Sequence, residues 1–130
     1  MSQALRRCAA LLGLCATSLV LALPAQAATV RVKCEVRADR SVASVDGAGL
    51  AAGAAYTAVL SSGSQSATSA AQAAKATGEA EFDFSSRRRD IAAGATAIAA
   101  DFIVGNQVTG RLVDAQGNTV ASASRSCRVR

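Results

Sequence analysis

TVRVKCEVR, residues 29–37, has the clearest periodicity in this chain. Apolar and charged residues alternate along it, so the apolar side chains share one face and the charged side chains share the other. A period of two over this length predicts a β-strand with one buried and one solvated face. Cys34 falls on the buried face, which is where a structural disulfide belongs.

Further strand signals follow on the C-terminal side of this stretch. In residues 79–85, Ala80, Phe82 and Phe84 alternate with acidic residues, so we expect the two phenylalanines to anchor the core. We expect the other strands at 41–45, 55–61, 107–114 and 119–129. The glycine-rich segment 46–53 reads as a loop held to the core by Leu50, and 115–118 reads as a hairpin turn.

Two segments and one residue fit this pattern less well. Residues 65–77 are rich in alanine, which favours helix, but alanine offers little surface to bury, so we favour a strand or loop. Residues 85–101 form a long connection in which we expect Ile91 and Ile98 to pack inward and Asp90 to start one helical turn. Arg125 interrupts the inward face of the last strand and predicts a nearby bulge.

The N-terminus reads as a cleavable secretory signal in residues 1–27. Arg6 and Arg7 precede an apolar stretch that is shorter than the roughly 20 residues of a membrane-spanning helix. A small-x-small peptidase pattern, Ala25-Gln26-Ala27, closes it. We therefore expect one domain over residues 28–130, which does not span the membrane after cleavage and is not retained by an anchor.

Two other export signals are weaker readings of the same residues. The residues before Cys8 and Cys15 are Arg7 and Leu14, which are not the small residues that a lipoprotein signal needs. Small residues follow the Arg6-Arg7 pair, where a twin-arginine signal has larger apolar ones. We expect the general secretory route, with a periplasmic or extracellular destination.

Only Cys34 and Cys127 remain after cleavage, and an even pair in an oxidising compartment predicts a disulfide. Such a bridge closes nearly the whole mature chain, for which the chain-entropy model gives about 4–5 kcal/mol. A redox-active pair would lie closer in sequence, and a metal site would need histidine, which the chain lacks.

Several short strands joined by Gly- and Ser-rich turns predict an all-β fold, a β-sandwich of about 6–7 strands. The layout resembles an immunoglobulin-like or fibronectin-type-III-like domain, with the disulfide joining the first strand to the last. Two features depart from true immunoglobulin domains: the chain has no Trp, and its cysteines lie at the ends. A small β-barrel is the alternative fold.

The residue inventory offers no catalytic constellation. Without histidine, Ser-His catalysis is excluded, and Lys33 and Lys75 lie in exposed segments unsuited to a general base. Glu79, Glu81 and Asp83 share one strand face, but the chain has few aromatics for a sugar cleft and no Asp-x-Asp loop for Ca²⁺. We interpret them as a solvated acidic face, and we expect no cofactor and no metal.

The charge pattern favours a protein or envelope partner. Removal of Arg6 and Arg7 lowers the net charge from +5 to +3, and the remaining cations are spread along the chain, which argues against nucleic acid. Arg87, Arg88 and Arg89 form the densest cluster, a hypothetical anion-contacting patch on an otherwise solvated loop.

These features lead to three functional hypotheses. The first is an exported, non-enzymatic interaction or structural module of the cell envelope. The second is a small secreted inhibitor of a hydrolase that inserts the 85–101 loop into its target. A small enzyme is the third, and the residue inventory supports it least.

Overall fold

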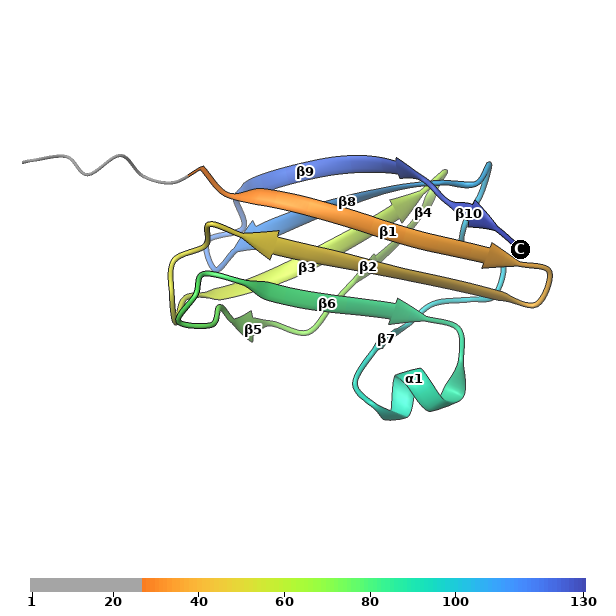
Figure 1. Ribbon diagram of the computed structural model, residues 1–130, viewed down its shortest axis with the longest axis horizontal. Helices are drawn as coiled ribbons and strands as arrows, with labels where there is room; N and C mark the ends of the chain where they lie inside the picture. The colour runs from red at the N-terminus through yellow and green to blue at the C-terminus, as the bar shows by residue number, and fades with distance from the viewer. Residues whose placement is uncertain (1–26) are drawn as a thin grey trace, which may run out of the picture.

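The structure, a computed structural model, describes residues 27–130. All of the predicted signal segment 1–27 except Ala27, including Cys8 and Cys15, lies outside the described residues. The described chain forms strands joined by turns, and one short helix (Figure 1). In chain order the elements are β1 Thr29–Arg37, β2 Arg40–Ala48, β3 Ala55–Ser62, β4 Gln65–Thr68, β5 Gln72–Ala73, β6 Ala80–Ser85, α1 Arg88–Ala92, β7 Thr96–Ala97, β8 Gln107–Asp114, β9 Thr119–Ser126 and β10 Arg128–Val129.

The strands form two sheets, and the predicted all-β fold is confirmed. Sheet A has the order β10-β1-β2-β6-β7, and sheet B has the order β4-β3-β8-β9, with the short β5 also pairing to β3. Within sheet A, β10 pairs with β1 and β7 with β6 in parallel, whereas the central strand β2 is antiparallel to both of its neighbours, β1 and β6. In the described part of the chain the ladders leave both sheets open and form no closed barrel.

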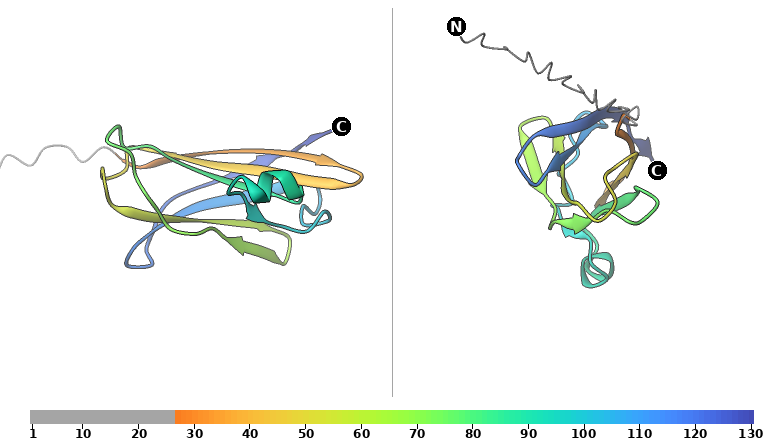
Figure 2. Two further views of the ribbon diagram at one scale, coloured as in Figure 1. Left: turned by 90° about the horizontal axis from the view of Figure 1, so that it is seen from below. Right: turned by 90° about the vertical axis from the view of Figure 1, so that its left-hand side faces the viewer.

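One hydrophobic core lies between side chains from both sheets. Phe82 and Phe84 of β6 are fully buried, as the alternation in 79–85 predicted, and Leu60 and Leu112 from sheet B are buried with them. Leu50 holds the loop after β2 against the same core, which confirms its predicted role. The end-on view in Figure 2 shows the strands around this core, with α1 projecting from the body.

The glycine-rich segment 46–53 is only partly the predicted loop. Strand β2 continues through Asp46 to Ala48, so Gly47 lies within a strand, where a Cβ would come 2.5 Å from Leu112 Cδ1. Gly49 and Gly53 have positive φ angles and make the turn itself. The prediction placed Gly47 in the loop because sequence composition cannot distinguish a glycine needed for close packing from one needed for backbone conformation.

The predicted last strand, 119–129, is two strands in different sheets. β9 pairs with β8 in sheet B, the chain crosses at Cys127, and β10 then pairs with β1 in sheet A. The predicted bulge near Arg125 is wrong, because the register shift occurs at Leu112/Val113, opposite the start of β9. The run of mostly small residues from 119 to 126 carries no signal that could mark the change of sheet.

Residues 65–77 are extended or irregular, as predicted, and contain β4 and β5 but no helix. The connection after β6 contains one helical segment, α1, which begins at Arg88 rather than at Asp90. Ile98 is buried as expected, but Ile91 is only half-buried, and α1 has no buried residue. The prediction that Ile91 packs into the core is therefore wrong, because the helix that carries it lies outside the core.

Buried serines fasten the irregular connections to the sheets. Ser62 Oγ accepts a hydrogen bond from the Val104 N–H and donates one to the Gln107 carbonyl, both at 2.7 Å. Ser41 Oγ donates to the Ala100 carbonyl at 2.7 Å. These bonds satisfy backbone groups that strand pairing leaves unpaired, so the long segment from β7 to β8 is held without regular structure of its own.

Candidate functional site

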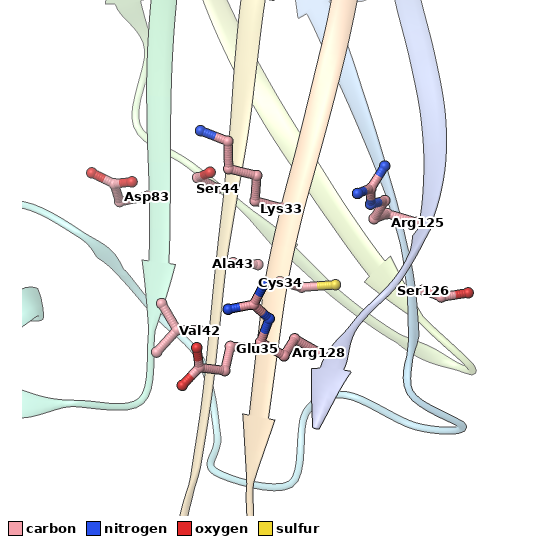
Figure 3. A pocket seen from close by; sticks show the side chains of 10 residues that line it. All are labelled: Lys33, Cys34, Glu35, Val42, Ala43, Ser44, Asp83, Arg125, Ser126 and Arg128. Carbon is pink, nitrogen blue, oxygen red and sulfur yellow. The ribbon is translucent and has the colours of Figure 1, made fainter. Parts of the chain in front are cut away.

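A groove of about 540 Å³ crosses the outer face of sheet A, over β1 and β2 (Figure 3). Strand alternation puts Lys33 and Glu35 of β1 and Val42 and Ser44 of β2 on this face, since their neighbours in sequence point to the core. β6 bounds the groove on one side and the β9–β10 junction on the other. The lining residues are Lys33, Cys34, Glu35, Val42, Ala43, Ser44, Asp83, Arg125, Ser126 and Arg128.

Two arginines form the basic side of the groove. Arg125 lies opposite the buried Val108 in the β8–β9 ladder, so the strand alternation gives it an inward-facing position. It is nevertheless exposed, because β9 does not pair with β1 there. Arg128 of β10 lies across β1 with its guanidinium end near Glu35 (Figure 3). Neither arginine makes an ion pair within 4.0 Å with any residue in 27–130. Both charges therefore remain available to a ligand.

Asp83 of β6 forms the acidic side, across the groove from Arg125 (Figure 3). Partial burial raises the pKa of its carboxyl, and the nearby carboxylates of Asp46, Glu81 and Asp90 raise it further. No cation of residues 27–130 lies within ion-pair distance of Asp83. The groove thus has unpaired charges of opposite sign on its two sides.

The charges in the middle of the groove are already paired. Glu35 accepts a hydrogen bond from Arg37 Nε at 3.0 Å and lies 3.4 Å from Arg130 Nε. The hydrogen bond from Arg37, followed by the charge of Arg130, lowers the pKa of Glu35. Lys33 Nζ lies 3.6 Å from Asp46 Oδ2. These pairs leave Arg125, Arg128 and Asp83 as the groups best able to contact a partner.

The predicted disulfide is confirmed and lies beside this groove. It joins Cys34 of β1 to Cys127, which are 93 residues apart in sequence and 4.7 Å apart at Cα. Cys127 is the residue at which the chain passes from sheet B to sheet A, so the bond fixes that crossing. A disulfide is compatible with an oxidising, exported compartment.

The predicted anion-contacting patch lies elsewhere. Arg87, Arg88 and Arg89 lie at α1, outside the groove, and Arg87 and Arg89 both pair with Asp90 at 3.8 and 3.5 Å. Asp90 also accepts a hydrogen bond from Ser85 Oγ at 2.8 Å, and that bond, followed by the two arginines, lowers its pKa. Arg88 is the exposed member of the cluster with no ion pair among residues 27–130.

Of the predicted acidic face in 79–85, Glu81 and Asp83 are exposed on the outer face of sheet A. Asp46 of β2 lies opposite Glu81. In residues 27–130, no group of three or more His, Cys, Asp or Glu side chains is arranged to hold a metal ion. No helix in that range is long and apolar enough to cross a membrane.

Sequence reasoning missed the groove, because its charges come from three distant parts of the chain: β1, β6 and the β9–β10 segment. The one available signal was Arg125, which broke the inward pattern of its strand. No protein-family model matches the chain, and no curated protein matches its sequence.

Proposed function

We propose that residues 28–130 form a single immunoglobulin-like β-sandwich, exported by the general secretory route after loss of a signal peptide. The strand order supports this fold. With β1, β2, β3, β4, β6, β8 and β9 taken as strands A, B, C, C′, E, F and G, the sheets are A-B-E and C′-C-F-G. That is the division of strands found in immunoglobulin-like sandwiches.

We propose that this domain is a non-enzymatic interaction module of the cell envelope, located in the periplasm or outside the cell. The observation that carries this proposal is the groove over β1, which has unpaired Arg125 and Arg128 on one side and unpaired Asp83 on the other. Such a division of charge complements a surface that itself carries both signs, which is typical of polypeptides. A uniformly anionic polymer would meet Asp83 and its acidic neighbours.

In-cell photo-crosslinking tests this function. A photoreactive amino acid replaces Ser44, on the floor of the groove, or Ser122, an exposed residue of β9 that does not line it. The proposal predicts a discrete adduct with an envelope protein from position 44 and none from position 122. Identical adducts from both positions, or none from position 44, would contradict the proposal.

One observation supports the alternative hypothesis of a secreted inhibitor. The segment after β6 carries α1, which has no buried residue and projects from the body of the molecule (Figures 1 and 2). A projecting loop can enter a cleft that a flat sheet cannot. Alanine substitution through 85–101, assayed against a panel of secreted hydrolases, tests this alternative: inhibition that no substitution changes removes it.

A further inference from the structure

One edge of β6 has no neighbouring strand along most of its length. On one side, β6 pairs with β2 from Ala80 to Ser85. On the other side, β7 pairs only with Phe84 and Ser85. Within residues 27–130, therefore, the edge from Ala80 to Asp83 is unpaired.

Two hydrogen bonds on opposite sides of β6 show which backbone groups face this edge. The Ser86 N–H donates to the Ser41 carbonyl of β2 at 3.0 Å, whereas the Ser85 carbonyl accepts from the Ile98 N–H, on the other side, at 3.1 Å. Backbone groups in an antiparallel pair point alternately toward and away from the partner. Phe82 and Phe84 therefore bond toward β2, and Glu81 and Asp83 direct their N–H and C=O groups to the open edge.

The side chains at this edge carry negative charge. Glu81 and Asp83 are exposed on the outer face of sheet A and make no ion pair with any residue in the described range. Acidic neighbours raise the pKa of Asp83, so a cation at this edge would relieve repulsion that the folded protein contains. A second copy of β6 would bring like charges together across the new ladder, which disfavours pairing between copies.

We propose that the open edge of β6 accepts an extended segment of a partner protein that carries Lys or Arg at alternate positions. The added strand lies in line with β7 on the same edge of sheet A, beside the N-terminal part of β6, and bonds to the free backbone groups of Glu81 and Asp83. Its cations meet the two carboxylates on the outer face, where Asp83 also forms the acidic side of the groove. This recognition mode, β-strand addition, takes affinity from main-chain bonds and specificity from alternate side chains. The inference rests on the proposed interaction function and names the partner's chemistry.

Peptide titration of the unaltered mature protein tests the inference. The probe is acetyl-Thr-Lys-Val-Lys-Val-Lys-Thr-amide, followed by amide shifts in proton–nitrogen NMR spectra. Two control peptides have the same sequence with N-methyl groups on either the lysines or the valines. We expect shifts centred on Glu81 and Asp83, and an at least ten-fold weaker Kd for one methylated peptide, since only one set of amides can face β6. Equal affinity for all three peptides, or shifts centred elsewhere, would overturn the inference.

A charge-reversal experiment tests the specificity separately. E81K/D83K should bind the lysine peptide at least ten-fold more weakly and should bind the corresponding glutamate peptide more tightly. The matched control, D39K/D101K, makes the same charge change at two exposed aspartates outside sheet A's ladders and should behave as the unaltered protein. If the control loses as much affinity, net charge rather than the edge governs binding and the inference fails.

The two proposals can fail independently. An adduct from position 44, together with no peptide binding at the β6 edge, would retain the interaction function and reject strand addition. Peptide binding at β6 without any adduct from position 44 would support the edge and reject the groove as the contact surface.

Discussion

Gly110 of β8 faces Val32 of β1 across the core so closely that a Cβ on Gly110 would lie 2.7 Å from Val32 Cγ2. The same atom would lie 2.9 Å from Cγ2 of Val45. Both valines are buried and β-branched, so they have few alternative rotamers with which to move away. The close approach of β8 to β1 and β2 at this point therefore requires a residue without a side chain at position 110.

Gly110→Ala is expected to destabilise the protein by about 1–3 kcal/mol, the usual cost of overpacking a filled core. Gly47→Ala is the matched comparison, because Gly47 also lies in a strand, but its Cβ would meet the terminal methyl carbons of Leu112 and Leu50. Those side chains can rotate, so the cost should be smaller. Urea unfolding measures both; a larger loss for Gly47→Ala would show that the valines are not the rigid contact.

Ser62→Ala is expected to lower the free energy of unfolding by about 0.5–1.5 kcal/mol, because it removes the hydroxyl that accepts from the Val104 N–H and donates to the Gln107 carbonyl. Ser64→Ala, two residues away at an exposed turn position, is the control and should change stability by less than about 0.5 kcal/mol. Urea midpoints compare the two variants. Equal midpoints would mean that water replaces the serine hydroxyl at no cost.

Replacing both Cys34 and Cys127 with alanine is expected to cost up to about 4–5 kcal/mol, since the bond closes a loop of 93 residues. Strand β10 has only two residues, so it should also leave β1 when the bond is absent. Urea unfolding gives the cost, and NMR shifts of Glu35 and Val36 report the loss of β10. A cost below about 1 kcal/mol would contradict this entropic role.

Asp83→Asn is expected to stabilise the protein slightly near neutral pH, by at most about 0.5 kcal/mol for so exposed a site. The raised pKa of Asp83 means that its ionised form disfavours the folded state, so the unaltered protein recovers this contribution as pH falls through the folded pKa toward the unfolded value of 3.8. The advantage of the Asn variant should therefore shrink between about pH 7 and about pH 3. If the Asn variant instead became more stable relative to the unaltered protein at low pH, the pKa of Asp83 would be lowered, and not raised, by folding.

The strands with clear alternation could be predicted from the sequence, and the short strands could not. β1 and β6 each place apolar residues at every second position, so the local pattern determined both their extent and their buried face. β5, β7 and β10 have two residues each, too few for any period to be visible. Their places depend on tertiary contacts, such as the bond from Ile98 to Ser85 and the disulfide at Cys127.

The candidate site was harder to predict for a related reason. Cys34 and Cys127 could be paired because they are the two cysteines outside the predicted signal segment. Arg125 and Asp83 have no such link in the sequence, and only the register of β6, β2, β1 and β10 brings them to two sides of one groove. The Arg87–Arg89 cluster was conspicuous in sequence, yet two of its three members are paired to Asp90.

Amide hydrogen exchange along β6 tests the open edge most directly, because it needs neither a variant nor a partner. The structure predicts an alternation in which the amides of Phe82 and Phe84 are protected by β2, whereas those of Glu81 and Asp83 exchange orders of magnitude faster. Equal and strong protection of all four amides would mean that another segment already covers this edge, and the account of β6 as a docking strand would be wrong.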